Sequence, residues 1–246
     1  RGTAYYLFRA NCPAMDELAE LTRDLVSIPS HEDEAAAGDR IEEWLRAETD
    51  ADLTRDDAGN VVARRGTDAG ASLALVGHHD VVPPADAQTE DGEYAVSERD
   101  GRLYGRGTAD MKGAVAAAML AFRDAGLRDS SGDAVTELVF ASFVGEEVGG
   151  EGARAAIDDG FAPDYAVVGE GSTGYSASGV TDVAVAHKGR RGSTITAHGA
   201  AAHASEPEAG ENAVYRACDA VDVVRESEFP TTEVLGEELS GSVAVT

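Results

Sequence analysis

Cysteine is scarce in this chain: Cys12 and Cys218 are the only two among 246 residues. So few cysteines in a chain of this length exclude a disulfide framework and are typical of a protein from a reducing compartment. No apolar run approaches the roughly 18 residues that a membrane-spanning helix needs. These absences favour a cytoplasmic protein that does not span a membrane.

Positive charge is scarce as well. Lysine and arginine total 20 against 46 aspartates and glutamates, which gives a formal net charge of −26. Such a chain cannot easily assemble the basic patch that a nucleic acid or an anionic membrane surface requires, so neither is expected as a partner. Hydrophobic residues still make up 43% of the chain, which indicates a globular protein rather than a disordered acidic tail.

Only two of the basic residues are lysines, Lys112 and Lys188. An acidic, lysine-poor surface stays hydrated in concentrated salt, where charge repulsion is screened within about 3 Å at 1 M. The composition therefore predicts a halophilic protein. The alternative is an acidic protein from an ordinary low-salt organism.

Acidic residues are absent from the first 14 positions, Arg1 to Ala14. A helical pattern opens immediately afterwards at Met15. We therefore expect residues 1–14 to be a non-native leader and Met15 to be the native start.

Apolar spacing predicts alternating helices and strands along the next part of the chain. Residues 72–76 form a continuous apolar run, which is typical of a strand buried on both faces. The alternation predicts an α/β fold with a mostly parallel sheet, helices on both faces and functional residues at the carboxyl ends of the strands. Helices are expected at 15–27, 34–49, 111–126 and from the Gly149-Gly150 turn to Ile157, and strands at 60–63, 72–76, 136–144 and 165–168.

The segment after the strand at 72–76 places His78 and Asp80 two residues apart. In an extended chain residues i and i+2 share a face, so these side chains project together while His79 points away. A carboxylate in that position can orient a metal-bound imidazole. The alternative is a satisfied histidine beside a turn aspartate.

Further acidic residues follow at the ends of predicted elements. Asp110 stands just before a predicted helix, where its alternative role is a plain N-cap. Glu146 and Glu147 follow a predicted strand, and neighbouring residues there point differently, so one is suited to ligate a metal and the other to act as a base. The alternative for this pair is solvated surface. Because Glu170 ends the next strand, the four groups together indicate a metal site at the strand ends.

Beyond residue 179 the pattern changes to smaller elements. The spacing predicts strands at 180–186 and 193–197, a helix at 212–224 that Asn212 caps, and a strand at 241–246.

Four ordered motifs resemble those of one enzyme family. They read Gly77-His78-His79-Asp80-Val-Val-Pro83, Gly105-Arg-Gly107-Thr-Ala-Asp110-Met-Lys112-Gly113, Gly145-Glu146-Glu147 and Gly169-Glu170. The set resembles the co-catalytic zinc hydrolases, the family that includes aminoacylases, acetylornithine deacetylases, succinyl-diaminopimelate desuccinylases and carboxypeptidase G. The resemblance runs from about Met15 to the end of the chain and implies the fold of a co-catalytic zinc exopeptidase.

The resemblance implies two zinc ions, with cobalt or manganese as alternatives. It also implies a role for each motif residue: His78 and Glu170 bind one ion, Glu147 binds the other, Asp110 bridges them, Glu146 is the general acid/base and Asp80 orients His78.

The stretch from His187 to Ala213 resembles the start of the family's inserted dimerisation domain. The resemblance implies a homodimer in which His203 reaches the partner subunit's site and helps to hold the oxyanion. The alternative for His203 is a surface turn histidine. We expect a catalytic domain at 15–180 and an incomplete α+β dimerisation domain at 181–246, in a truncated chain whose second metal site lacks a ligand.

These expectations converge on a metal-dependent hydrolase that removes an acyl group from a small N-acyl amino acid, of the succinyl-diaminopimelate desuccinylase or acetylornithine deacetylase type. One alternative is a metallo-carboxypeptidase or dipeptidase. Another, from a different class, is a non-catalytic relative or fragment that acts as a binding or dimerising module.

Overall fold

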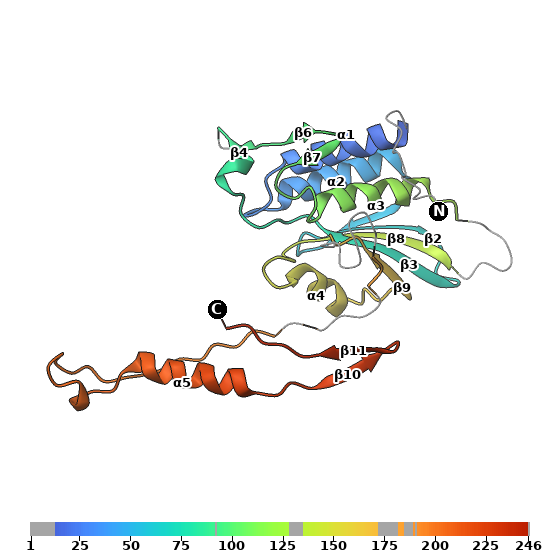
Figure 1. The fold of residues 1–246 in the computed structure, drawn as a ribbon. Helices are drawn as coiled ribbons and strands as arrows, with labels where there is room; N and C mark the ends of the chain where they lie inside the picture. The colour runs from blue at the N-terminus through green and yellow to red at the C-terminus, as the bar shows by residue number, and fades with distance from the viewer. Residues whose placement is uncertain are drawn as a thin grey trace, which may run out of the picture. The chain divides into compact units, whose positions relative to one another are not determined.

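The computed structural model describes residues 13–91, 93–127, 135–171, 182–184, 189 and 191–245. The chain divides into two units, within residues 1–173 and 174–246. Figure 1 shows the first unit as a sheet with helices on both faces, and the second as a helix followed by a two-stranded hairpin.

A five-stranded sheet of order β1-β2-β8-β3-β9 forms the centre of the first unit. β1 pairs antiparallel with β2 and β2 antiparallel with β8, whereas β8, β3 and β9 are parallel neighbours. The α/β fold predicted from the sequence is confirmed, and the sheet is mixed, with parallel pairing among the three strands that carry the site. The strands are β1 Asp52–Arg55, β2 Val61–Gly66, β3 Ala71–His78, β8 Val135–Phe143 and β9 Tyr165–Val168.

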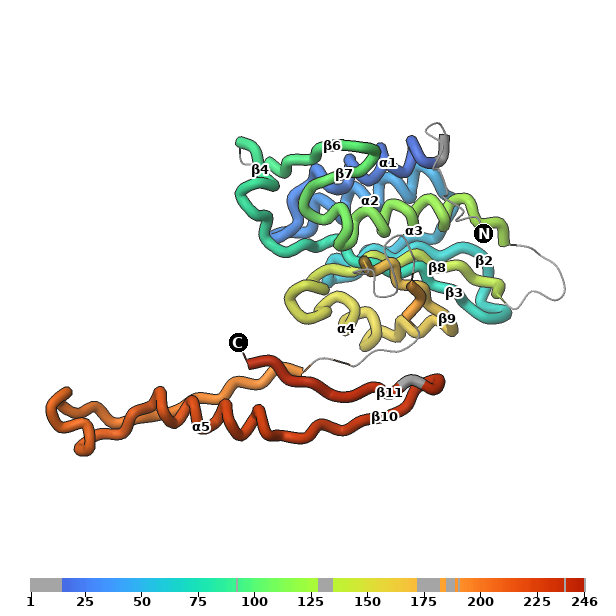
Figure 2. Tube along the Cα trace, in the orientation of Figure 1, coloured from blue at the N-terminus to red at the C-terminus, as the bar shows by residue number. Residues whose placement is uncertain are grey.

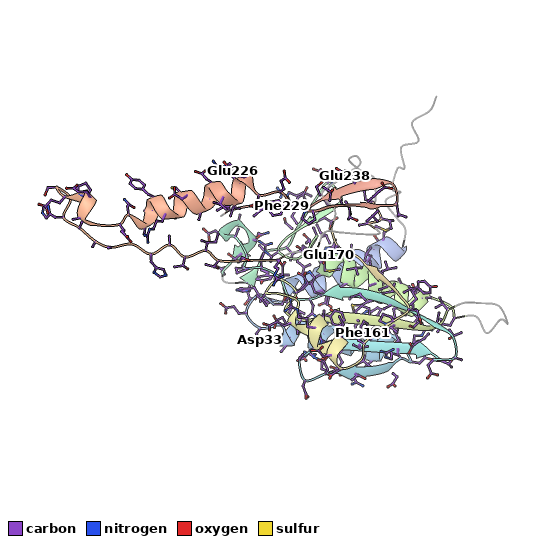
Figure 3. All side chains as sticks on the ribbon, turned by 90° about the horizontal axis from the view of Figure 1, so that it is seen from below. Asp33, Phe161, Glu170, Glu226, Phe229 and Glu238 are labelled. Atoms are coloured by element: carbon purple, nitrogen blue, oxygen red, sulfur yellow. The ribbon has the colours of Figure 1, made fainter. Side chains whose placement is uncertain are left out.

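Three helices cover one face of this sheet and a fourth covers the other, as Figures 1 and 2 show. On β8, Phe140 packs into the cluster formed with the three helices, and its neighbour Ala141 packs into the cluster that contains Ala156 of the fourth. Phe161, labelled in Figure 3, packs edge-on against Phe143 with ring centroids 5.5 Å apart. The alternation along β8 is that of a strand buried on both faces. The helices are α1 Pro13–Ser27, α2 Ala35–Glu48, α3 Lys112–Asp124 and α4 Glu151–Asp158.

The connections explain why the sheet is mixed. β1 and β2 are joined by a tight turn in which Gly59 has a φ of +100° and its N–H donates to Asp56 O at 3.0 Å. A turn this short joins antiparallel neighbours, whereas a helix between two strands returns the chain in the same direction. Because α3 lies between β3 and β8, and α4 between β8 and β9, these strands end at one edge of the sheet.

Between β3 and α3 the chain makes a long excursion. It contains a short 3-10 helix and two small hairpins. Their bounds are η1 Asp86–Gln88, β4 Thr89–Glu90, β5 Glu93–Tyr94, β6 Ser97–Arg99 and β7 Arg102–Tyr104.

The described residues of the second unit form one long helix and one hairpin. The predicted helix is confirmed as α5, and Asn212 caps it, since its side-chain oxygen accepts the N–H of Val214 at 2.8 Å and of Tyr215 at 3.4 Å. The elements are η2 Pro207–Ala209, α5 Ala213–Glu226, β10 Thr231–Val234 and β11 Glu237–Ser240, with β10 and β11 antiparallel.

Two strand predictions in this unit are wrong. Residues 193–197 have no regular secondary structure and are mostly exposed, because no strand in the described part of the chain pairs with them. Residues 241–245 are also outside the strands. The pairing of β10 with β11 ends next to the hydrogen bond that the Gly241 N–H donates to Pro230 O at 3.1 Å. The strand predicted at 180–186 lies outside the described residues, apart from 182–184, which are not in a strand.

Candidate metal centre

The site begins at the end of β3, where three polar residues are buried. His78, His79 and Asp80 are 2%, 0% and 3% exposed. His78 Nδ1 lies 3.0 Å from the backbone oxygen of Asp80 and 3.2 Å from Asp80 Oδ1. Because both oxygens can only accept, the proton of a neutral imidazole belongs on Nδ1, and Nε2 keeps its lone pair. This is the tautomer of a histidine that binds a metal through Nε2.

Carboxylates from three other segments surround that Nε2 atom. It lies 3.2 Å from Asp110 Oδ1, 3.7 Å from Glu170 Oε1 and 3.9 Å from Glu146 Oε2. In addition, three possible metal-ligand atoms, one each from His78, Asp110 and Glu147, lie within 4.8 Å of one another. Glu170, labelled in Figure 3, follows β9. The strand ends therefore gather one imidazole and four carboxylates, and both members of the Glu146-Glu147 pair reach the cluster.

The cluster carries an excess of negative charge around the histidine. Burial alone lowers the pKa of His78, but Asp80, Glu170 and Glu146 outweigh it and raise that pKa to about 9. Burial and the neighbouring acids raise the pKa of Glu147, and burial raises that of Glu170. At this pKa the metal-free ring is an imidazolium whose Nε2–H faces the carboxylates, and a divalent cation bound there would take the place of that proton. The donor set therefore fits a divalent metal ion bound by oxygen and imidazole ligands.

Asp80 connects two parts of this cluster. Its Oδ1 faces His78, and its Oδ2 accepts the backbone N–H of Glu147 at 2.9 Å. Burial raises the pKa of Asp80, but its hydrogen bonds with His78 and with the backbone of Glu147 and Glu146 hold it below the usual value. Asp80 therefore remains ionised and links the end of β3 to the segment after β8.

Close packing of glycines brings Asp110 to the strand ends. Gly107 has a φ of +83° and its carbonyl accepts the N–H of Lys112 at 2.9 Å. A Cβ atom on Gly77 would lie 3.0 Å from Met111 Cε, and one on Gly169 would lie 2.9 Å from Ala114 Cβ. The start of α3 thus lies against β3 and the end of β9 because these motif glycines have no side chain.

Gly113 provides a test of this packing. A Cβ atom there would lie 2.4 Å from the backbone oxygen of Thr108, so Gly113→Ala is expected to destabilise the first unit by about 1–3 kcal/mol. The matched control is Gly126→Ala, because a Cβ at Gly126 meets nothing within 4 Å. Urea unfolding followed by the fluorescence of Trp44, the single tryptophan, measures both variants. Equal stability of the two variants would contradict the packing argument.

A cavity of about 200 Å³ adjoins the cluster. His78, Glu146 and Glu170 line one part of it. The remaining lining is mostly apolar and comes from β3, α3, the end of β8, α4 and β9: Val76, Met111, Phe143, Val144, Ala153 and Val168, with the glycines Gly77 and Gly150. The centre therefore opens beside a surface suited to the apolar part of a small ligand.

His79 is not one of the cluster residues. His79 points away from it, as the strand alternation predicts, and its Nδ1 lies 2.8 Å from Ser142 Oγ. Burial lowers the pKa of His79 to about 3, so this ring is neutral. His203 is an exposed residue of the second unit, and its Nδ1 contacts Ser205 Oγ at 2.8 Å.

The sequence does not predict the buried residues that contact the segments carrying the cluster. Lys112 is fully buried, and Ser30 and Ser142 are buried as well. Lys112 carries a signal, as one of two lysines in the chain, but the sequence does not show what it contacts. A serine within an ordinary loop or strand carries no comparable signal.

The parallel strands of this α/β sheet gather a histidine and carboxylates at one edge. This is the ligand set of a divalent metal site. The model of peptidase family M20/M25/M40 matches residues 74–239. The chain belongs to this family, which confirms the resemblance of its four motifs.

Curated relatives agree with this assignment. The chain is 31% identical over 216 residues to a probable succinyl-diaminopimelate desuccinylase of Staphylococcus epidermidis, covering 84% of this chain and 50% of the relative. It is 32% identical over 225 residues to the succinyl-diaminopimelate desuccinylase of Bordetella petrii, covering 85% of this chain and 56% of the relative. It is 34% identical over 157 residues to the acetylornithine deacetylase of Proteus mirabilis, covering 63% of this chain and 37% of the relative. The chain thus spans about half the length of the curated relatives it matches.

Solved structures share the fold. A tripeptidase from Staphylococcus aureus superposes with a TM-score of 0.58 at 18% identity, covering 92% of this chain and 63% of the other. The aminopeptidase PepT from Bacillus cereus gives a TM-score of 0.54 at 18% identity, with 92% and 64% coverage. None of the helices in the part of the chain that the structure describes has the length and apolar character needed to cross a membrane.

Proposed function

We propose that this protein is a metal-dependent amide hydrolase that removes an acyl group from a small N-acyl amino acid, of the succinyl-diaminopimelate desuccinylase or acetylornithine deacetylase type. The observation that carries the proposal is the position of the His78 Nε2 atom, which lies 3.2 Å, 3.9 Å and 3.7 Å from carboxylate oxygens of Asp110, Glu146 and Glu170. The names of the curated relatives support the type of substrate.

The proposed centre holds two zinc ions, with cobalt or manganese as alternatives. His78 and Glu170 would hold the first ion and Glu147 the second, with Asp110 shared between them. When bound, such ions polarise an amide carbonyl and lower the pKa of water. Asp80 keeps the His78 proton on Nδ1, so that Nε2 remains a ligand.

Glu146 is the proposed general acid/base. It is half-exposed beside the cavity, where it can reach both water and substrate. Its carboxylate takes a proton from the attacking water as the oxygen bonds to the amide carbon, and it returns the proton to nitrogen as the C–N bond breaks. The products are a carboxylate and a free amine.

We further propose a homodimer in which residues 15–180 form the catalytic domain and residues 181–246 belong to the dimerisation domain. In this arrangement His203 of one subunit donates a hydrogen bond to the oxyanion at the partner's centre. Exposed apolar residues on α5 support an interface there: Val214, Tyr215 and Val223 are 66%, 70% and 68% exposed.

A substrate panel tests the function. The longest natural chain that contains this sequence is assayed with N-succinyl-diaminopimelate, N-acetylornithine and dipeptides, before and after metal removal with a chelator. Hydrolysis of an N-acyl substrate that the chelator abolishes and zinc restores is the expected result. Hydrolysis of dipeptides alone would indicate a peptidase, and the absence of both metal binding and turnover would indicate a non-catalytic relative.

We also propose that the protein is cytoplasmic and halophilic, and its thermal stability tests the second point. A net charge of −26 repels itself until salt screens it, with a Debye length of about 10 Å at 0.1 M and about 3 Å at 1 M. Exposed ion pairs such as Arg46–Glu42 weaken in salt but contribute little. The melting temperature is therefore expected to rise between 0.1 M and 2 M potassium chloride. A steady fall over that range would contradict the halophilic assignment.

A further inference from the structure

Lys112 is a fully buried lysine two residues beyond Asp110. Its Nζ atom donates hydrogen bonds to the backbone oxygens of Leu25, at 3.0 Å, and Ile28, at 2.6 Å. Leu25 lies in the last turn of α1 and Ile28 directly follows that helix. At this helix end the Leu25 carbonyl also accepts the N–H of Ile28 at 3.3 Å, so the ammonium adds a second donor to Leu25 and supplies the donor that the structure gives to the Ile28 carbonyl.

The same segment also holds the end of β3. Ser30 Oγ donates to the backbone oxygen of His79 at 2.7 Å, and the Ser30 carbonyl accepts the N–H of Val81 at 3.2 Å. Ser30 is 0% exposed. Residues 25–30, which we call the α1 bracket, therefore bind two segments that carry cluster residues: the backbone of the one containing Asp80, and the Lys112 side chain of the one containing Asp110.

Burying an ammonium costs free energy. A lysine retained in such a place is therefore expected to contribute something that an apolar side chain cannot. A methionine would fill similar space without the desolvation penalty, but it could not hold two carbonyls at fixed distances. The hydrogen bonds span more than 80 residues of sequence, so they set a distance between elements rather than a local turn.

We propose that Lys112 is a positioning residue for the metal centre: through the α1 bracket it sets the position of Asp110 relative to His78. The inference rests on the proposed function, because it requires that this cluster binds metal. Lys112 does not touch the cluster's ligand atoms in this scheme and acts only through the backbone of the segment that carries Asp110.

Three variants separate positioning from general stability. Lys112→Met removes the ammonium, and Ser30→Ala removes the second tie of the same bracket. The control is Arg123→Met, because Arg123 also joins α3 to α1, through a paired contact with both carboxylate oxygens of Glu17, but lies outside the bracket. The stability of each metal-free variant is measured by circular dichroism, and binding is compared where all variants are folded.

The readouts are the affinity for Zn²⁺ in competition with a chelator and the visible spectrum of the Co²⁺-loaded protein. Lys112→Met is expected to lose about tenfold in Zn²⁺ affinity, the lower end of what outer partners of metal ligands contribute, with an altered Co²⁺ spectrum. Ser30→Ala is expected to shift both readouts in the same direction by a smaller amount. Arg123→Met is expected to lose stability while keeping the wild-type affinity and spectrum.

Either of two results would overturn this inference and leave the proposed function intact. The first is wild-type Zn²⁺ affinity and Co²⁺ spectrum in both Lys112→Met and Ser30→Ala. The second is a loss of Zn²⁺ affinity in Arg123→Met equal to that in Lys112→Met at matched stability. If Lys112→Met does not fold, the comparison of Ser30→Ala with Arg123→Met decides by the same criteria. A wild-type protein that binds neither ion would overturn the proposed function, and the inference with it.

Discussion

Replacing Glu146 with glutamine is expected to lower kcat for amide hydrolysis by about 10²- to 10⁴-fold, the range typical of a lost general base. The amide of glutamine has nearly the same shape as the carboxylate but cannot accept a proton from water at neutral pH. Metal binding is expected to persist, because the proposed ligands are His78, Asp110, Glu147 and Glu170 and do not include Glu146. Steady-state kinetics and metal content per chain are the two measurements.

Glu151→Gln is the matched control for this variant. Glu151 is an exposed carboxylate in the first turn of α4, five residues beyond Glu146, and its removal is expected to leave kcat unchanged. Unchanged turnover in Glu146→Gln would contradict its role as general base. Loss of bound metal in that variant would instead make Glu146 a ligand and exchange its role with that of Glu147.

The second large effect is expected at Asp80. Asp80→Asn is expected to weaken Zn²⁺ binding by about 10- to 100-fold, as is typical when the partner of a metal-binding histidine is removed. The Glu147 N–H needs an acceptor, which places the new amide N–H₂ group against His78 Nδ1. Two donors then face each other, which favours moving the imidazole proton to Nε2 and removing the lone pair that the metal requires.

Asp164→Asn is the control for Asp80→Asn. Asp164 is also a carboxylate that accepts two hydrogen bonds beside β3, from Ser72 N at 2.8 Å and Ser72 Oγ at 3.0 Å, but at the opposite end of the strand. Its substitution is expected to leave Zn²⁺ affinity unchanged in the same chelator competition. Equal affinity of the Asp80→Asn variant and the wild type would show that the backbone oxygen of Asp80 alone suffices to orient His78.

Much of the candidate site could be predicted because its residues follow local rules. The alternation of a strand explains why His78 and Asp80 share a face and why His79 turns to Ser142 instead. The same rules failed at residues 193–197, where no strand among the described residues pairs with the alternating pattern. A strand requires a partner from elsewhere in the chain, and a short apolar pattern does not identify one.

The sequence by itself determined the α/β class, most of the helices and central strands, and the four motifs in their order. These features depend on side-chain period, helix caps and turn residues, which act over a few residues; the Asn212 cap of α5 is one example. Only the tertiary structure decided that β8 lies between β2 and β3, which carboxylates surround His78 Nε2, and that Lys112 binds the end of α1. Those contacts join residues far apart in the chain, and their geometry follows from how strands and helices pack into one core rather than from any local pattern.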